Sequence, residues 1–338
     1  TGDIKGAWLS DTDTTNVVGT ELVTNTTDRD FSGALVDWSG AIAPVAGVGT
    51  VTLGADFSIS GLVAGKVYVV NWEIVAITTG TPRMYMIGIT EGQVASNYPL
   101  GLNSRTFTPT DGTVTFRTYF YGGGPGDYDI DNFSIKLADA DRSVNNNGLQ
   151  VNGTITKTAV ATGADLVAYS GFSSSNYLEQ PYNADLDFGT GDFSIMGWIK
   201  PSGLSGWLLS QGLVGTTSYY GASLLFNGGL LRFYTSDTSG SSVADGTPPA
   251  TGVWSHCCGI RRDGVLEIWV NGSLVVSNAV TSRNLINTAN VTRIGLGVDG
   301  NSAISGSLAL MRFSATAPTA AQILEIYNAE KPLFQENA

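Results

Sequence analysis

The chain has 338 residues, of which 42% are hydrophobic and 14% charged, and its formal net charge is −12. This length and apolar content allow two domains of ordinary size or one large β domain, and they exclude a disordered chain. The negative charge argues against nucleic acid and anionic membranes as partners, because like charges repel. No apolar run reaches the length that a bilayer requires, so we expect no membrane insertion.

The N-terminal part predicts a lead-in segment followed by a first β domain. Residues 1–20 are mostly polar, with Trp8 and Leu9 as their adjacent large apolar pair, and we interpret them as the lead-in. The chain begins without methionine or a signal peptide, so we expect a piece of a longer protein. From residue 21 to residue 138, apolar and polar residues alternate between turn signals, as in a β-sandwich or jelly roll. The strands expected here are 66–77, 83–89, 113–121 and 128–137.

A second β domain is expected after a polar boundary. Residues 139–147 are rich in Asp and Asn and contain one large apolar residue, Val144, which is typical of a linker. The second domain then covers residues 148–333. A short helix is predicted near the end of this domain. Pro318 lies in its first turn, and Ile323, Leu324 and Tyr327 share one face. Residues 334–338 are interpreted as a tail that leaves the fold.

The stretch 254–276 predicts three short strands joined by two tight turns. Asp263-Gly264 and Asn271-Gly272 are each two residues long and stand between apolar runs, which is a strong hairpin signal. Both turns need positive φ, which Asn, Asp and Gly tolerate. A meander this regular belongs to an antiparallel sheet that buries at least one face.

The same stretch holds the residues with the most obvious reactivity, His256, Cys257 and Cys258. Neighbouring cysteines on a strand face opposite sides of the sheet, so we expect two buried free thiols. The single histidine is interpreted as a packing residue rather than a catalytic base. A glycosidase needs two carboxylates flanking the bond, and Glu267 stands alone on its strand. We therefore expect no enzymatic activity.

The second domain resembles the laminin-G-like, concanavalin A-like jelly rolls. The resemblance covers most of residues 170–328, and its motifs follow one another in the family's order. They lie at residues 176–179, 186–200, 252–256, 262–264, 266–272 and 294–295. The resemblance implies an antiparallel jelly roll closed by a short helix.

The first domain is similar to the galactose-binding-like jelly rolls of carbohydrate-binding modules, on residues 21–25, 59–68 and 129–135. The terminal strands of such modules often share a structural calcium. The resemblance places Glu21 and Asp131 at the matching ends, so they are the candidate calcium ligands. The alternative is that Asp131 only accepts a hydrogen bond in a turn.

The joint between the domains resembles a linker of tail and fibre proteins from tailed bacteriophages and prophages. Residues 139–144, 148–151 and 164–170 carry this resemblance, and residues 332–337 look like the continuation into a further domain. The resemblance implies an extracellular location in the virion tail. It also implies other tail subunits as partners and a homo-oligomer, expected to be a trimer.

Sugar recognition on β-sandwiches uses exposed aromatic rings together with directional hydrogen bonds from Asn, Asp and Arg. The candidate aromatic residues lie near Arg83 and Arg117 in the first domain and in polar loops of the second. They are Tyr85, Tyr98, Tyr119 and Tyr121 in the first domain and Trp207, Tyr219 and Tyr220 in the second. The alternative for each is a place in the core, where we expect Trp72 and Trp198.

We thus predict an all-β chain of two tandem antiparallel β-sandwich (jelly-roll) domains with one short C-terminal helix. The predicted function is non-catalytic attachment of a tail fibre or adhesin to a bacterial surface glycan, with calcium as a structural cofactor. Two alternatives stay open. One is a virion structural or spacer protein whose lectin-like domains contact neighbouring subunits, and the other is a secreted polysaccharide-binding accessory module.

Overall fold

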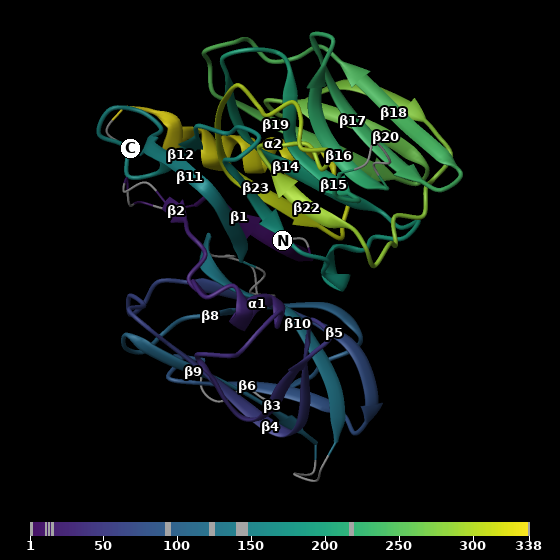
Figure 1. The fold of residues 1–338 in the computed structure, drawn as a ribbon. Helices are drawn as coiled ribbons and strands as arrows, with labels where there is room; N and C mark the ends of the chain where they lie inside the picture. The colour runs from purple at the N-terminus through teal and green to yellow at the C-terminus, as the bar shows by residue number, and fades with distance from the viewer. Residues whose placement is uncertain are drawn as a thin grey trace. The chain divides into compact units, whose positions relative to one another are not determined.

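The computed structural model describes residues 3–10, 12, 14, 17–91, 96–121, 126–139, 148–215 and 220–336. The chain divides into two compact units, both drawn in Figure 1. The small unit is Thr20–Ala138, and the large unit combines Thr1–Gly19 with Asp139–Ala338. The strands of both units pair antiparallel, as the alternation of apolar and polar residues predicts.

The small unit is a β-sandwich. Its elements are α1 (Thr27–Asp30), β3 (Trp38–Val45), β4 (Val48–Ser60), β5 (Tyr68–Thr79), β6 (Pro82–Ile87), β7 (Ser96–Asn97), β8 (Gly101–Phe107), β9 (Thr113–Phe120) and β10 (Asp127–Asp139). One layer has the order β3-β4-β9-β6-β7, and the other has the order β10-β5-β8. Between the layers lie aromatic rings such as Trp72, Phe116 and Phe133. Trp72 is 1% exposed, which confirms its predicted burial.

The large unit is a larger sandwich with several short connecting elements. Its strands are β1 (Ile4–Trp8), β2 (Val17–Gly19), β11 (Leu149–Ala159), β12 (Val167–Ser170), β13 (Tyr177–Gln180), β14 (Phe193–Pro201), β15 (Gly206–Gly212), β16 (Gly221–Asn227), β17 (Leu230–Asp237), β18 (Gly240–Gly246), β19 (Ser255–Arg262), β20 (Val265–Val270), β21 (Ser273–Ala279), β22 (Val291–Ile294) and β23 (Gly306–Ser314). Its helical elements are η1 (Ala184–Leu186), α2 (Ala320–Glu330) and η2 (Lys331–Phe334).

Two sheets enclose the core of the large unit. The helix-covered sheet has the order β1-β23-β14-β19-β20-β21. The pocket-bearing sheet has the order β13-β22-β15-β16-β17-β18. Leu, Ile and Phe side chains from both sheets fill the space between them, among them Ile195, Leu224 and Phe233. This arrangement follows from strands that present every second residue to one shared core.

The interpretation of residues 1–20 as a separate lead-in is wrong, because β1 within this stretch is a strand of the large unit. β1 pairs with β23, and Trp8 lies opposite Met311. Trp8 and Leu9 are buried in the core of the large unit. The backbone N–H of Leu9 also donates to Asp139 at 3.0 Å. The apolar residues at the N-terminus thus complete the sandwich that the C-terminal part of the chain builds.

The predicted meander is confirmed. β19, β20 and β21 follow one another and pair in sequence. Asp263 and Gly264 have φ of 47° and 75°, and Asn271 and Gly272 have φ of 50° and 79°. Positive φ at both central residues is the geometry of the turns that match the right-handed twist of hairpin strands.

The C-terminal helix is confirmed, and its start and the tail differ from the prediction. Thr319, not Pro318, caps α2, in a capping box with Gln322. Ile323 is buried against the helix-covered sheet. Beyond the helix, η2 brings Phe334 over the ring of Trp198, with 4.2 Å between the ring centroids. Phe334 therefore belongs to the fold, because its ring covers apolar surface. In the described part of the chain, neither α2 nor α1 is long and apolar enough to cross a membrane.

Candidate functional site

The histidine and the two cysteines form no reactive centre. His256, Cys257 and Cys258 are all 0% exposed, and both cysteines are free, as predicted. Burial lowers the pKa of His256 to about 3 and raises the pKa of Cys257 to about 12. Neither ring nitrogen of His256 has a hydrogen-bond partner among the described residues. The histidine is thus neutral at physiological pH and the thiols stay protonated, a state that suits packing.

The two predicted calcium ligands do not form a calcium site as they are arranged. The carboxylate of Glu21 accepts hydrogen bonds from Ser134 Oγ at 2.6 Å and from the N–H groups of Val23 and Ile135 at 3.0 Å. Such donors turn their positive ends toward the oxygens that a cation would need. Asp131 accepts from the N–H of Asn132 at 2.7 Å, which is the turn contact that the alternative predicts.

No group of three or more His, Cys, Asp or Glu among the described residues is arranged to hold a metal ion. Burial, together with the charge of Glu73, raises the pKa of Asp131. Calcium binding by this chain stays a prediction.

Three of the four predicted tyrosines of the first domain lie together on the outward face of β6 and β9. The register places Arg83 opposite Tyr119 and Tyr85 opposite Arg117. The intervening residues, such as Met84 and Phe116, point into the core. Alternation along the two paired strands therefore puts the polar aromatic residues on one side. We call the surface formed by Asp56, Arg83, Tyr85, Arg117, Tyr119 and Tyr121 the tyrosine face.

Ion pairs and ring contacts hold the tyrosine face in place. Arg117 donates through Nε and Nη2 to Asp56, at 2.7 Å each, and through Nη1 to the hydroxyl of Tyr85 at 2.9 Å. The Asp56 carboxylate raises the pKa of Arg117 above its already high value. The rings of Tyr85 and Tyr119 meet edge to face with 5.1 Å between centroids. The side chains are thus ordered before any ligand arrives, which reduces the entropic cost of binding.

The exposed end of the tyrosine face is Tyr121, and a groove lies beside its centre. Tyr121 is 66% exposed, and the guanidinium of Arg83 lies 4.4 Å from its ring centroid. A groove of about 320 Å³ runs next to Tyr119 and Arg117. Gly40 lines the groove at φ 98°, where a Cβ would lie 2.7 Å from the Gly54 carbonyl oxygen. Glycine at this bulge allows the close approach of β3 to β4.

Tyr98 is not part of the tyrosine face. Its ring packs edge to face against Trp72, with 4.5 Å between centroids, and it adjoins the core of the small unit. Its hydroxyl accepts a hydrogen bond from Arg105 at 3.3 Å. The strand that precedes it, β7, is short and turns this ring inward. Tyr98 therefore supports Trp72.

In the large unit, Trp207 lines a pocket of about 360 Å³, which we call the Trp207 pocket. Its other walls come from β16, β17 and a loop before β23, and include Leu225, Asn227, Arg232, Tyr234 and Asp299. Trp207 itself is only 7% exposed, so it offers an edge of its ring rather than an open stacking face. Tyr220 is half-buried away from this pocket, and its carbonyl accepts from the side chain of Asn290. Tyr219 lies outside the described residues.

Most residues of the Trp207 pocket are not among the site residues predicted from the sequence. Arg232 and Tyr234 alternate along β17 with the core residues Leu231 and Phe233, which is the signal that places them on the outer face. Arg232 forms a two-pronged ion pair with Asp245, at 2.7 and 2.8 Å. The pair of Arg232 and Asp245 cannot be predicted from local sequence, because it forms between two neighbouring strands.

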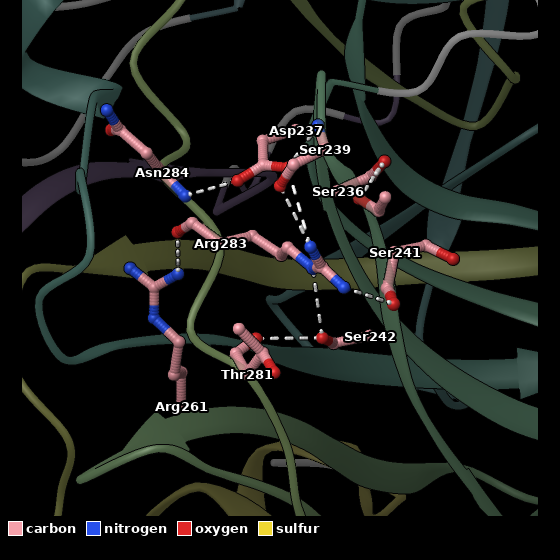
Figure 2. A network of polar contacts seen from close by, with 10 residues as sticks. Ser236, Asp237, Ser239, Ser241, Ser242, Arg261, Thr281, Arg283 and Asn284 are labelled. Atoms are coloured by element: carbon pink, nitrogen blue, oxygen red, sulfur yellow. Dashed lines mark hydrogen bonds and ion pairs between the residues drawn. The ribbon is translucent and has the colours of Figure 1, made fainter.

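Figure 2 shows a polar network near the turn between β17 and β18, in which serine residues surround Arg283 and Asp237. Arg283 donates to Ser239 Oγ at 3.0 Å and to Ser242 Oγ at 3.3 Å, and its Nη1 lies 3.7 Å from Asp237. The buried Arg261 donates to the Arg283 carbonyl at 2.7 Å. These groups satisfy one another and fix the segment after β21 onto the hairpin. We therefore regard the network as structural.

The sequence of the large unit matches a known family. Residues 172–324 match the model of the concanavalin A-like lectin/glucanases superfamily. This segment has the concanavalin A-like jelly-roll fold. A curated relative, adhesion G-protein coupled receptor V1 from Danio rerio, is 26% identical over 146 residues, which are 40% of this chain and 2% of the receptor.

Two solved structures that resemble this chain are single domains of larger proteins. The binding domain of botulinum neurotoxin DC in complex with SialylT has a TM-score of 0.43 and 16% identity, over 58% of this chain and 49% of that one. Domain 4 of AbnA, a GH43 extracellular arabinanase from Geobacillus stearothermophilus, in complex with arabinotriose, has a TM-score of 0.42 and 15% identity, over 56% and 92%. This chain thus spans about half of the toxin domain's length.

Proposed function

We propose that this chain is a non-catalytic attachment protein that binds a bacterial surface glycan through the tyrosine face. One observation carries the proposal: Tyr85, Tyr119 and Tyr121 converge on one open surface of the small unit, where arginine and aspartate side chains hold them. Tyrosine rings stack on the C–H faces of pyranose rings. Asp56, Arg117 and the tyrosine hydroxyls supply directional hydrogen bonds to sugar hydroxyls.

Binding rather than catalysis agrees with what the remaining reactive groups do. His256, Cys257 and Cys258 are buried. Glu267 accepts from the indole N–H of Trp269 at 2.8 Å and pairs with Arg262 at 3.4 Å. These contacts occupy the carboxylate that stands on the central meander. The superfamily that the large unit matches includes glucanases as well as lectins, so binding is supported by its lectin members only.

The finer role that we propose is that of a tail fibre or tail-associated adhesin of a tailed bacteriophage. The support for it is the resemblance of residues 139–144, 148–151 and 164–170 to linkers of such proteins. In that role the chain would be extracellular on the virion, contact other tail subunits and form a homotrimer.

A glycan array probed with the full chain, with and without calcium, tests the proposal. We expect the chain to bind a defined set of bacterial glycans both with and without calcium. Tyr119→Ala and Tyr121→Ala should each weaken that binding about tenfold, because each removes a stacking ring worth roughly 1 kcal/mol or more. Leu102→Ala is the matched control, because Leu102 is 54% exposed on β8, in the other layer.

The alternatives predict different results. A folded chain that binds no glycan would contradict attachment and leave the spacer role, in which the lectin-like domains contact neighbouring subunits. Binding restricted to plant or other environmental polysaccharides would favour a secreted polysaccharide-binding accessory module.

A further inference from the structure

We propose that Asn227 is a modification site, at which the folded chain spontaneously exchanges a side-chain amide for a carboxylate. The sequence contains four Asn-Gly pairs, and such pairs are prone to this reaction because glycine has no side chain to hinder the attacking backbone nitrogen. The structure describes three of them in full, Asn152-Gly153, Asn227-Gly228 and Asn271-Gly272. Of these three, Asn227 alone has surroundings that leave the reaction free to proceed.

The reaction needs no enzyme and consumes one molecule of water. The backbone nitrogen of Gly228, after losing its proton, attacks Cγ of the Asn227 side chain. A C–N bond forms, the bond from Cγ to Nδ2 breaks, and ammonia leaves with a proton from the solvent. A water molecule then opens the cyclic imide at either of its two carbonyls. The products are aspartate and isoaspartate, and both release the proton of the new carboxyl group at neutral pH.

Asn227 stands at the open end of a hairpin. It is the exposed last residue of β16, and it pairs with Leu230, the first residue of β17. Gly228 and Gly229 form the turn, with φ of 59° and 78°, and a Cβ on either would meet nothing within 4 Å. Neither the side chain of Asn227 nor the N–H of Gly228 has a hydrogen-bond partner among the described residues. The reacting atoms can therefore meet without breaking tertiary contacts, because the end of a hairpin opens at little cost.

Asn271 begins the same dipeptide in a turn that is closed. Its Oδ1 accepts the backbone N–H of His256 at 2.9 Å, and its own N–H donates to the His256 carbonyl, also at 2.9 Å. A Cβ on Gly272 would lie 2.8 Å from Leu324 Cδ1, so α2 lies directly against this turn. Ring closure would have to break the side-chain hydrogen bond and move the turn away from α2. We therefore expect Asn271 to react slowly in the fold.

Asn152 lies inside a sheet rather than at a turn. It belongs to β11 and stands opposite Tyr177 of β13. The next residue, Gly153, pairs with Gly19 of β2, and a Cβ there would lie 2.1 Å from Asn176 Oδ1. Strand pairing thus fixes the backbone on both sides of the bond that would have to rotate. The reaction here requires local opening of β11, which protects Asn152.

The modification would change the charge of the Trp207 pocket, because Asn227 is one of the residues that line it. This pocket already holds the carboxylate of Asp299 and the guanidinium of Arg232, two of whose nitrogens donate to Asp245. The described lining contains no second cation to pair with a carboxylate at position 227. The modified chain should therefore repel anions at this pocket more strongly than the fresh chain. Isoaspartate would also lengthen the backbone at the end of β16.

Peptide mapping by mass spectrometry on the full folded chain tests the inference, after incubation at mildly alkaline pH in water enriched in heavy oxygen. The label enters wherever the imide is hydrolysed, and fragment spectra separate Asn152 from Asn147, which lies outside the described residues. We expect Asn227 to take up label at least tenfold faster than Asn152 and Asn271, because local opening limits those two. In urea, which removes the fold, the three should react at similar rates. An isoaspartyl methyltransferase should methylate the aged peptide that contains position 227.

Gly228→Ala tests the role of the turn. Its Cβ hinders the attack on Asn227, so uptake of label there should fall at least tenfold. Gly252→Ala is the matched control, because Gly252 also has positive φ, 76°, and open space around its Cβ position. Near-ultraviolet circular dichroism checks that both variants are folded. The inference is overturned if Asn227 takes up no label in the folded chain, or if Asn152 or Asn271 reacts as fast as Asn227 does.

Discussion

The two outer faces of the large unit carry similar residues and use them differently. On the helix-covered sheet, the indole of Trp198 donates to Glu330 at 2.7 Å, and the same carboxylate pairs with Arg312. The rings of Tyr327 and Phe334 lie over Trp198, which is 2% exposed. The prediction that Trp198 is buried is confirmed, and an acid–arginine–tryptophan set is here part of the core.

On the pocket-bearing sheet, a tryptophan, an arginine and an aspartate again lie close together. Trp207 and Arg232 line the pocket, and Asp245 pairs with Arg232 on its edge. No helix among the described residues covers them. The residue types alone therefore do not decide whether a tryptophan, an arginine and an acidic residue form part of the core or line an open pocket. That depends on whether α2 covers them. Four predictions test this comparison.

Trp198→Ala should have the largest effect on stability. It removes a large buried ring, two ring contacts and the hydrogen bond to Glu330, and we expect a loss of about 3–5 kcal/mol in the free energy of unfolding. Chemical denaturation followed by near-ultraviolet circular dichroism measures it. Leu324→Ala on α2, the helix whose Tyr327 stacks on Trp198, is the control and should change little, because Leu324 is 47% exposed. A loss below about 1 kcal/mol would show that α2 does not stabilise the covered face.

His256→Leu should alter how stability depends on pH. The folded-state pKa of His256 is about 3, below the ordinary value of 6.5. Between pH 3 and pH 6.5 this histidine is therefore protonated in the unfolded chain and neutral in the folded chain. The wild type therefore loses stability as pH falls from about 6.5 toward 3, by about 2 kcal/mol at pH 5 from this group alone. His256→Leu should lack this part of the decline in urea titrations at pH 7.5 and pH 5. Equal declines in the two proteins would mean that His256 is protonated in the fold.

The sequence predicts the elements of this covered face well, and the pocket poorly. Asp263-Gly264 and Asn271-Gly272 encode their turns locally, so the meander could be located from residues a few positions apart. Trp207 was recognised only as an aromatic residue near a polar loop. Its pocket arises because residues 297–303, far along the chain, close against it, and single-sequence patterns carry no information about that contact.

The tyrosine face lies between these two cases. Alternation along β6 and β9 correctly identifies Arg83, Tyr85, Arg117 and Tyr119 as outward residues. The register that sets Tyr85 opposite Arg117, and the partner Asp56 on β4, depend on how strands pair across long sequence separations. Tyr98 was misplaced for the same reason, because β7 turns it toward Trp72.

Gly297→Ala should damage the pocket more than the fold. The added methyl would lie 2.5 Å from an Asp299 oxygen and 2.7 Å from Trp207 Nε1, so the loop must shift, at a cost of about 1–2 kcal/mol. We expect faster hydrogen exchange in the loop of residues 297–303, while the helix-covered face keeps its near-ultraviolet spectrum. Gly203→Ala is the control, since its added methyl would meet Ser305 at an ordinary 3.6 Å. Unchanged hydrogen exchange of this loop in Gly297→Ala would show that its close approach to Trp207 does not order it.

Arg117→Lys should have the smallest effect on stability and still weaken attachment. Arg117 and Asp56 are both part-exposed, so the pair contributes at most about 1 kcal/mol. A lysine ammonium cannot bridge both oxygens of Asp56 and also donate to Tyr85, because it lacks the planar fork of the guanidinium. Tyr85 then loses its fixed position, and glycan affinity should fall several-fold with an unchanged denaturation midpoint. Arg29→Lys in the same unit is the control. Wild-type glycan binding by Arg117→Lys would contradict this prediction. It would mean that the tyrosine rings need not be held in place to bind glycan. Exposure alone would then distinguish the tyrosine face from the covered face of the large unit.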